Sequence, residues 1–490
     1  MRPVLTAKEM QRAEEDAFRA GLSPQEAMAR AGRAVFEEAK RFHHVLVYAR
    51  CSNNGGDGFV CANLLHQAGI ATDVVVLGNP ERLSPHAAFY YEKIKPLILA
   101  APAGNYDCVI DALFGIGFHG ALSGPELAAA KEINEYGRQA AVIAVDVPSG
   151  LSCDNGLTDF CVKADRTVTF GCKKTGHFLG EGAEVCGRIT VADIGIAPQQ
   201  FAVAEPEITD IAALMPPVKS TAHKGTNGHA GILAGSRGME GAGELSAISA
   251  LRCGAGKVSM LVPEDCAAYY SGRHPEIMVA AANMTDERIL RTFREGKDVL
   301  LLGPGIGRSR ENAALLETVL HYSTVPLVLD ADGLYFCTAA LLQSARCPII
   351  ITPHMGEAAR LFRTDMTFLQ QDPIGCTSEF ARQTGATVLL KSNYNIVCSS
   401  TNSLISQWGC PAMATAGSGD VLAGITAGAV LLCKGNLQNA ALLASFLHGT
   451  AGRAAQKKKG VYSVIASDIS ENIFEAFSVL RSGTNQLFPV

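Results

Sequence analysis

A glycine-rich heptapeptide in the second half of the chain carries the most specific chemical signal in the sequence. Residues 414–420 read Ala-Thr-Ala-Gly-Ser-Gly-Asp, and an apolar stretch typical of a buried helix follows at once. Transfer of a phosphoryl group needs N–H donors for the developing negative charge and a nearby carboxylate that takes a proton. A glycine-rich helix start that ends in Asp420 offers both, although an ordinary glycine-rich cap can read the same way. We therefore predict Asp420 as a catalytic base.

Three polar clusters in the first half each follow an apolar stretch that is typical of a strand. The first is Asn-Asn-Gly-Gly-Asp-Gly at residues 53–58, expected as a turn directly before a helix; the second is Asp111 with residues 114–120; the third is Asp146 with Ser149. One such cluster is usually only a turn or a cap. Ligands of an open parallel sheet bind beyond the carboxyl ends of its strands, and glycine N–H groups at a helix start attract anions. Three clusters at strand ends therefore predict an anionic ligand.

The elements that must position these residues form two series of short apolar runs alternating with helical stretches, which predicts parallel sheets. Two helices open the chain, marked by the caps Thr6 with Glu9 and Ser23 with Pro24 and Glu26. The first series has strands expected at residues 45–49, 71–78, 107–115 and 140–150, with helices at 58–69 and 124–137. The second has strands expected at residues 230–235, 257–263, 298–305, 326–330, 348–354, 386–391 and 395–399, with two helical runs after residue 416.

A stretch with a Pro-Pro pair and no clear strand, residues 201–221, separates the two series. We predict domains at residues 1–205 and 215–485, because 490 residues exceed the usual domain size of about 100 to 200 residues. No internal repeat relates the halves, so they are different domains.

Composition excludes several classes of protein. A net charge of −5 argues against a nucleic-acid partner. None of the fifteen cysteines forms a C-x-x-C pair, and most stand in apolar stretches, so we expect free thiols in a reducing compartment. The N-terminus has no apolar core of a signal peptide, and the longest apolar run, residues 421–433, is too short to cross a membrane. We expect a cytoplasmic protein with no membrane partner.

The first half resembles the epimerase domain of the bifunctional NAD(P)H-hydrate repair enzymes. The matching stretches are NNGGDG, DALFGIGFHGALSGP, VDVPSGL, TFGCKKTGH and RITVADIGI, so the resemblance covers nearly all of residues 1–200. It implies a Rossmann-like parallel sheet and a potassium ion bound by Asn54, Asp111 and Ser149, with Asp111 as a candidate for moving the proton in epimerisation. The residues that it implies for binding the hydrated dinucleotide are Asn53, Asn54, Gly55, Gly56, Asp57, Gly115, Ile116, Gly117, Phe118, His119, Gly120, Ala121 and Asp146. One departure is Arg50-Cys51-Ser52, where the family usually has glycines.

The second half resembles the ADP- or ATP-dependent dehydratase of the same family, which implies a ribokinase-like α/β fold. The match begins with His-Lys-Gly-Thr at residues 223–226 and runs through AGILAGSRGMEGAGELSAISALRCGAGKV, GPGIG, ITPHMGE and LLK to the heptapeptide. The resemblance implies that Gly243, Gly305, His354 and Asp420 contact the substrate. It implies ADP binding, with Mg²⁺, by Lys391, Ser392, Asn393, Tyr394, Asn395 and Gly419. The family usually has glycine where Ser392 stands.

Together the two resemblances imply one repair pathway, in which the first domain interconverts the R and S hydrates of NADH or NADPH and the second dehydrates the S form. ADP would be converted to AMP and phosphate, and we expect a homo-oligomer. Two alternatives stay open: a ribokinase-like small-molecule kinase, and a first half that only binds and does not catalyse. His354 with the His-Lys-Gly start argues against the kinase. The single tryptophan, Trp408, is expected to pack rather than to stack on adenine.

Overall fold

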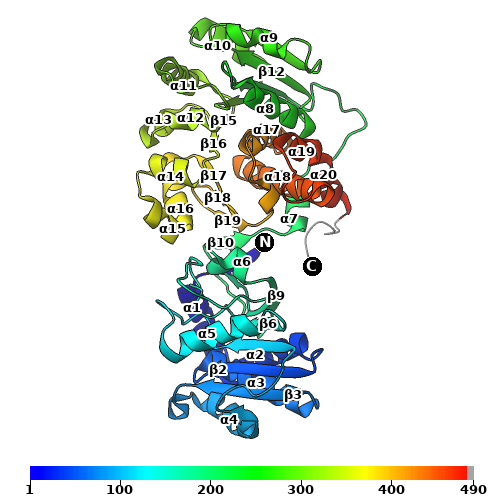
Figure 1. Cartoon of the computed structure of the whole chain (residues 1–490). Coiled ribbons are helices and arrows are strands. Elements are labelled where there is room, and N and C mark those ends of the chain that lie inside the picture. Colours follow the sequence, from blue (N-terminus) through cyan, green and yellow to red (C-terminus); the bar gives the residue numbers. More distant parts are fainter. Residues whose placement is uncertain (483–490) are drawn as a thin grey trace. The chain divides into compact units, whose positions relative to one another are not determined.

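The computed structural model describes residues 1–482, which form two compact units (Figure 1). The first unit spans Arg2–Ala204, and the second begins at Glu205 and includes Met1. The stretch 201–221, expected to hold no clear strand, contains the short strand β10 (Val203–Glu205) and the short helix α7 (Ile208–Ala212). Their few residues are too short a window for hydrophobic periodicity to reveal.

The N-terminal unit is built on a seven-stranded sheet in which every neighbouring pair of strands is parallel. Its strand order is β4-β3-β2-β5-β6-β7-β9, so the order reverses between β2 and β5, as in a Rossmann-like sheet. The strands of this sheet are β2 (His44–Arg50), β3 (Ala71–Leu77), β4 (Ile98–Leu99), β5 (Cys108–Ala112), β6 (Ala141–Val145), β7 (Arg166–Phe170) and β9 (Arg188–Ala192). The short strands β1 (Arg2–Leu5) and β8 (Lys173–Lys174) pair with each other outside it.

The two faces of this sheet carry separate cores because side chains alternate along each strand. On β2, Val45 and Val47 belong to the core that includes helix residues Val35 and Phe59, whereas Leu46 packs with the other face. The helices of the unit are α1 (Ala7–Arg19), α2 (Pro24–Ala39), α3 (Asn53–Gln67), α4 (Pro85–Ile94), α5 (Gly124–Tyr136) and α6 (Gly182–Val185). The first two begin where the sequence predicts, although the Ser23 side chain makes no capping hydrogen bond.

The expectation that residues 53–58 form a turn before a helix is wrong, because α3 begins at Asn53 with Ser52 as its cap. Its glycines serve close packing. A Cβ on Gly55 would lie 1.7 Å from the carbonyl oxygen of Arg50, and one on Gly58 would lie 2.6 Å from the Cβ of Ala112. The helix can approach β2 and β5 this closely only because these positions have no side chain.

The C-terminal unit is built on a sheet with the order β13-β12-β11-β14-β15-β16-β17-β18-β19. Its strands from β13 to β17 are parallel, and β18 and β19 are antiparallel additions. These strands are β11 (His229–Leu233), β12 (Lys257–Val262), β13 (Ile277–Ala281), β14 (Val299–Leu302), β15 (Leu327–Leu329), β16 (Ile349–Ile351), β17 (Thr387–Lys391), β18 (Asn395–Cys398) and β19 (Ser403–Ser406). The order reverses between β11 and β14, again next to glycine-rich loops.

Helices cover the strands of this second unit (Figure 1). They are α8 (Glu240–Arg252), α9 (Ala267–Tyr270), α10 (Glu287–Arg294), α11 (Arg310–Tyr322), α12 (Asp332–Tyr335), α13 (Ala339–Ser344), α14 (Met355–Phe362), α15 (Met366–Gln371), α16 (Pro373–Thr384), α17 (Ser418–Leu432), α18 (Leu437–Lys459), α19 (Ala466–Glu471) and α20 (Ile473–Ser482). Helix α17 is buried along most of its length. It packs on α8, where a Cβ on Gly424 would lie 2.1 Å from the carbonyl oxygen of Ser246.

The cysteines, the tryptophan and the apolar helices can be located within residues 1–482. All fifteen cysteines lie in this range and are free. Trp408 packs its ring 5.1 Å from that of Phe446, which confirms a packing role. Among the described residues, no helix has the length and apolar character needed to span a membrane.

Candidate active sites

The three polar clusters of the N-terminal unit come together at the carboxyl ends of its strands. A Cβ on Gly115 would lie 2.7 Å from the Asn54 side-chain oxygen and 3.0 Å from Oδ2 of Asp146. The backbone N–H of Ile116 donates to the same Oδ2 at 3.3 Å. The first turn of α3, the loop after β5 and the end of β6 therefore meet at one point, as the sequence predicts.

Asp111 and Ser149 form a buried hydrogen-bonded pair at this point. The Ser149 hydroxyl donates to Oδ1 of Asp111 at 2.6 Å, and the Ser149 N–H donates to Oδ2 at 2.8 Å. Burial raises the pKa of Asp111 to about 6, while the bonds from Ser149 act in the opposite direction. A carboxyl with this pKa can take and give a proton near neutral pH.

The residues predicted to hold potassium are suited to it in type. Carboxylate, hydroxyl and amide oxygens are the hard ligands that such a cation prefers. Asp111 and Ser149 lie side by side, and the Asn54 amide nitrogen is buried without a hydrogen-bond partner among the described residues. The amide nitrogen is a hydrogen-bond donor and would bind an acceptor group of a ligand, whereas a cation would need the side-chain oxygen of Asn54.

A buried lysine, which the sequence reasoning did not single out, faces Asp146. Lys174 donates from Nζ to Oδ1 of Asp146 at 2.6 Å, to Thr169 Oγ1 at 2.7 Å and to the Phe170 carbonyl oxygen at 3.1 Å. The pairing holds the pKa of Asp146 low, against the effect of burial, and raises that of Lys174. Asp146 itself has a φ of 68°, a left-handed conformation that is strained for a residue with a side chain.

Three further titratable groups surround this ion pair. Burial raises the pKa of Glu14 to about 7 and raises that of the half-buried Asp57 well above its usual range, and Asp146 adds to both effects. Burial next to Lys174 lowers the pKa of His177 to about 3, so its ring is neutral. The Nδ1 atom of the ring accepts a hydrogen bond from the backbone N–H of Lys174, and its Nε2 atom lies 3.1 Å from the carbonyl oxygen of Asp146.

The loop predicted to bind the dinucleotide, residues 115–121, divides into buried and exposed positions. The side chain of Phe118 is buried and packs on Phe114, whereas Gly117, His119, Gly120 and Ala121 are exposed. Residues of this loop line a cavity of about 400 Å³. Asn53, at the start of α3, is exposed and accepts a hydrogen bond from Ser84.

Each residue of the Arg50-Cys51-Ser52 departure has a local role. Ser52 caps α3 by accepting the N–H of Gly55 at 3.2 Å. Cys51 lies against Gly78, and Arg50 extends toward Glu126 and Phe114. Arg50 also lines the cavity just described.

In the C-terminal unit, Asp420 lies in the first turn of α17, whose N-cap residue, Gly417, has the left-handed conformation. Burial, with smaller contributions from the charges of Asp330 and Asp332 and against the opposing effect of Lys391, raises the pKa of Asp420 to about 6. The carboxyl is therefore close to the titration range in which a general base is effective.

A second lysine–aspartate pair lies beside this helix start. Lys391, at the end of β17, contacts the buried Asp330, which directly follows β15, with 2.7 Å between Nζ and Oδ1. A Cβ on Gly419 would lie 3.6 Å from the same Nζ and 3.9 Å from Oδ2 of Asp330. Gly419, Lys391 and Asp330 thus form one cluster, of which Asp330 was not predicted.

The segment predicted to hold ADP is the turn between β17 and β18. Ser392 and Asn393 are exposed and hydrogen-bonded to each other, whereas Tyr394 is buried. Asn395 pairs with Lys391 in the ladder of the two strands. Only the first two turn residues therefore offer their side chains to solvent.

The two glycines predicted to contact substrate differ in their surroundings. Gly305 has a φ of 63° in the loop after β14, where Ser236 donates to its carbonyl oxygen at 2.8 Å. Gly243 lies inside α8, and a Cβ there would lie 2.8 Å from both Met260 Cε and the Tyr270 hydroxyl. Gly243 therefore permits close packing of α8 on the sheet.

His354 has a visible structural role, because it caps α14. Its Nδ1 accepts the N–H groups of Gly356 at 3.0 Å and Glu357 at 3.3 Å. The rest of the ring is exposed, and its backbone forms a bridge with Lys391, so it stands at the same edge of the sheet as the lysine.

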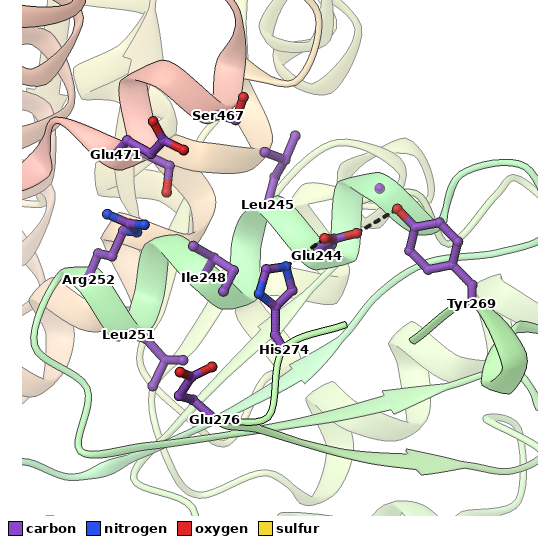
Figure 2. A pocket seen from close by; sticks show the side chains of 12 residues that line it. Glu244, Leu245, Ile248, Leu251, Arg252, Tyr269, His274, Glu276, Ser467 and Glu471 are labelled. Atoms are coloured by element: carbon purple, nitrogen blue, oxygen red, sulfur yellow. Dashed lines mark hydrogen bonds and ion pairs between the residues drawn. The ribbon is translucent and has the colours of Figure 1, made fainter. Parts of the chain in front are cut away.

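Figure 2 shows a cavity of about 640 Å³ that contains none of these residues. It lies on α8 and is lined by Gly241, Glu244, Leu245, Ile248, Leu251, Arg252, Tyr269, His274, Glu276, Ser467, Ser470 and Glu471. Its central carboxylate, Glu244, already accepts hydrogen bonds from Tyr269, Arg273 and His274. None of the residues that the sequence singles out lines this cavity, so volume alone does not identify the active site.

Several charged or titratable residues that lie beside the predicted carboxyl groups in the two units were not identified from the sequence. Lys174 and His177 lie in the stretch TFGCKKTGH, where a lysine directly after an apolar run was an available signal. Asp330 ends an apolar strand, as Asp111 and Asp146 do, and was equally visible. Nothing distinguished Glu14 from its acidic neighbours, or His448, which lies 3.2 Å from the Ser418 hydroxyl.

The family models match both halves of the chain. Residues 230–475 match the model described as NAD(P)H-hydrate dehydratase, and residues 24–176 match the one described as YjeF-related protein N-terminus. A bifunctional NAD(P)H-hydrate repair enzyme of Moorella thermoacetica is 34% identical over 482 residues, which cover 90% of each chain. This likeness spans both units.

Two solved structures resemble the second unit. The ADP/ATP-dependent NAD(P)H-hydrate dehydratase of Bacillus subtilis, crystallised with ATP and Mg²⁺, is 25% identical with a TM-score of 0.52, covering 57% of this chain and 100% of its own. A ribokinase-like superfamily protein of Enterococcus faecalis, 24% identical, has a TM-score of 0.52 over 57% of this chain and 96% of its own. The fold of the second unit is ribokinase-like.

Proposed function

Because the chain belongs to the bifunctional NAD(P)H-hydrate repair enzymes, we propose that its two units perform successive steps in restoring hydrated NADH and NADPH. The N-terminal unit epimerises the R and S hydrates. The C-terminal unit dehydrates the S hydrate and converts ADP to AMP and phosphate. The observation that carries this proposal is Asp420, a carboxyl with a pKa raised to about 6 beside the Lys391–Asp330 pair at a glycine-rich helix start.

The dehydration begins with Asp420 as base. Its carboxylate takes the proton of the substrate hydroxyl at C6, and the hydroxyl oxygen attacks the terminal phosphorus of ADP. The bond from that phosphorus to the bridging oxygen breaks, and AMP leaves. The C6–O bond then breaks with loss of phosphate, and loss of a ring proton restores the dihydronicotinamide. The N–H groups of Gly419 and its neighbours stabilise charge on the phosphoryl oxygens.

Lys391 would bind the phosphates of the nucleotide, and Mg²⁺ bound to those phosphates would neutralise part of their charge. Lys391 contacts Asp330, and a phosphate would compete with that carboxylate for the ammonium group. The exposed turn residues Ser392 and Asn393 contact the rest of the nucleotide, and Gly305 and His354 contact the hydrated substrate.

In the N-terminal unit, Asp111 moves the proton in epimerisation. Its pKa of about 6 leaves both protonation states accessible, and Ser149 fixes its orientation. Asp146, kept ionised by Lys174, contacts the dinucleotide together with Asn54 and the loop 115–121. Asn54, Asp111 and Ser149 would hold a potassium ion, which would supply positive charge next to the buried carboxylates.

The test follows the near-ultraviolet absorbance of dihydronicotinamide while the full chain acts on a mixture of R and S hydrates with Mg·ADP. Recovery beyond the initial S fraction is expected, and Asp420→Asn abolishes it. Asp365→Asn, which alters a helix cap outside the cluster, serves as the matched control and retains the rate. Recovery that stops at the S fraction would mean that the N-terminal unit is not an epimerase.

The second test separates the proposed roles of Asp111. An asparagine there keeps one oxygen for a cation and for the Ser149 hydroxyl, loses the acceptor of the Ser149 N–H, and cannot exchange a proton at neutral pH. We expect Asp111→Asn to stop recovery at the S fraction while S dehydration is unchanged. Full recovery by this variant would refute the proton-transfer role.

The alternative of a small-molecule kinase is not favoured, because the family match over residues 230–475 is to the dehydratase and the relative from Moorella thermoacetica matches over both units. A kinase would transfer the phosphoryl group to a stable product. Release of phosphate in proportion to the dihydronicotinamide formed distinguishes the two reactions.

A further inference from the structure

Arg50 occupies a special place in the N-terminal unit. It is the last residue of β2, one of the two strands between which the strand order reverses. The loop 114–123, which follows the other of these strands, lines the same cavity of about 400 Å³ as Arg50 does. Arg50 is the only arginine or lysine in the lining of this cavity, which is otherwise formed by glycine, alanine, aromatic, leucine, serine, histidine and glutamate side chains.

The guanidinium of Arg50 is held in place by two neighbours. Its Nε donates to Oε1 of Glu126 at 3.3 Å, and its central carbon lies 5.0 Å from the centre of the Phe114 ring. Both side chains also line the cavity. A cation stacked on a ring and fixed at Nε has lost much of its rotational freedom before any ligand arrives, which lowers the entropic cost of binding.

The other edge of the guanidinium is available. Neither terminal amine of Arg50 has a hydrogen-bond partner among residues 1–482, and the side chain is 39% exposed. Arginine presents its N–H groups as a planar fork that matches the oxygens of a phosphate. Because Glu126 balances the charge of Arg50, the attraction for such an anion comes from the short-range N–H groups on the open edge of the guanidinium.

We infer that Arg50 binds a phosphate group of the hydrated dinucleotide and so determines how tightly the epimerase unit holds its substrate. The inference rests on the proposed function, since the phosphates of that substrate are its anionic groups. Arg50 acts as a binding residue and takes no part in moving the proton. The phosphate is either the pyrophosphate shared by both hydrates or the 2′-phosphate that only the NADPH hydrate carries.

The experiment uses the full chain without nucleotide, so that the C-terminal unit is idle, and follows conversion of each purified R hydrate to S by chromatography. The variants are Arg50→Met, which keeps the length of the side chain, and Arg50→Lys, which restores a charge without the fork. Arg41→Met is the matched control, because Arg41 also lies 5.0 Å over a ring, that of Phe42, but outside the cavity.

For Arg50→Met we expect KM to rise about tenfold or more with kcat within about twofold of the parent, since charge-assisted bonds are worth roughly 1.5 to 3 kcal/mol. Arg50→Lys recovers part of the loss. A rise confined to the NADPH hydrate identifies the 2′-phosphate, and an equal rise for both hydrates identifies the pyrophosphate. The inference is overturned if KM for both hydrates stays within about twofold of the parent, or if kcat alone falls. A parent chain that does not interconvert the hydrates refutes the proposed epimerase instead.

Discussion

The pH below which the dehydration rate falls should depend on the charge of Asp330, which lies in the cluster with Lys391 and Gly419. In the parent, Asp420 is ionised only above its pKa of about 6, and a base must be ionised to act, so the rate falls as pH drops through that value. Asp330 is the second cause of this raised pKa, after burial. The substitution Asp330→Asn removes that charge while keeping an oxygen for Lys391.

Two effects of the substitution act in the same direction. Without the negative charge at position 330, the ionised form of Asp420 is no longer repelled. Lys391, no longer paired with a carboxylate, stabilises that ionised form further. The pKa of Asp420 is raised from 3.8 to about 6, mostly by burial, which the substitution leaves in place. We therefore expect the midpoint of the acid limb to move down on the order of one pH unit, or about 1.4 kcal/mol.

The assay is kcat for the S hydrate at saturating Mg·ADP, measured as initial rates across the acid limb. Asp332 is the last cause of the raised pKa and is itself paired with Arg308, so Asp332→Asn should move the midpoint less. Asp365→Asn should not move it. A midpoint for Asp330→Asn that equals the parent's would refute the electrostatic account, whatever happens to the plateau rate.

Three further variants test other parts of the structure. Burial and Lys391 lower the pKa of His448 to about 4, so below pH 6.5 the unfolded chain binds a proton that the folded chain does not, and the free energy of unfolding falls. The measurement is urea unfolding followed by Trp408 fluorescence. Between about pH 7 and pH 5, the parent should lose about 2 kcal/mol more stability than His448→Gln. His354→Ser keeps an N-cap oxygen whereas His354→Ala does not, so only the alanine variant should lose about 1 kcal/mol of stability, and both should lose dehydratase kcat/KM if the ring contacts substrate. Gly55→Ala forces a Cβ against the carbonyl oxygen of Arg50 and should destabilise the N-terminal unit by about 3 kcal/mol or more. Epimerisation should then be lost while S dehydration remains. A variant that epimerises normally and has the same melting temperature as the parent would contradict the packing argument.

The sequence predicted the architecture well because hydrophobic periodicity is a local property. Apolar runs such as residues 45–49 became β2, and the three polar clusters that follow such runs meet at one edge of the sheet. Parallel strands place their carboxyl ends together whatever the loops contain. The position of Asp111 and of Asp146 at the end of an apolar run is therefore enough to predict that both lie at this edge of the sheet.

The tuning of those residues could not be predicted, because it depends on contacts between segments far apart in the chain. Lys174 reaches Asp146 through the pairing of β8 with β1, two strands of a few residues each. Glu14 belongs to the first helix and has no local sign of burial. Adjacent glycines whose N–H groups can turn toward an anion predict a turn at residues 53–58, but these residues form the first turns of α3 and their glycines allow close packing against β2 and β5.

Both units combine a carboxyl group of raised pKa with a lysine–aspartate ion pair. Each has a carboxyl whose pKa burial raises to about 6, Asp111 in one and Asp420 in the other. Each also has a lysine–aspartate pair at the strand ends, with Lys174 on Asp146 and Lys391 on Asp330. A carboxyl that can exchange a proton next to a carboxylate held by a lysine lets one site bind charge and move a proton at the same pH. The folds of the two units differ, so each ion pair is built by its own set of strands, and we expect each lysine to be as necessary as the carboxyl that it accompanies.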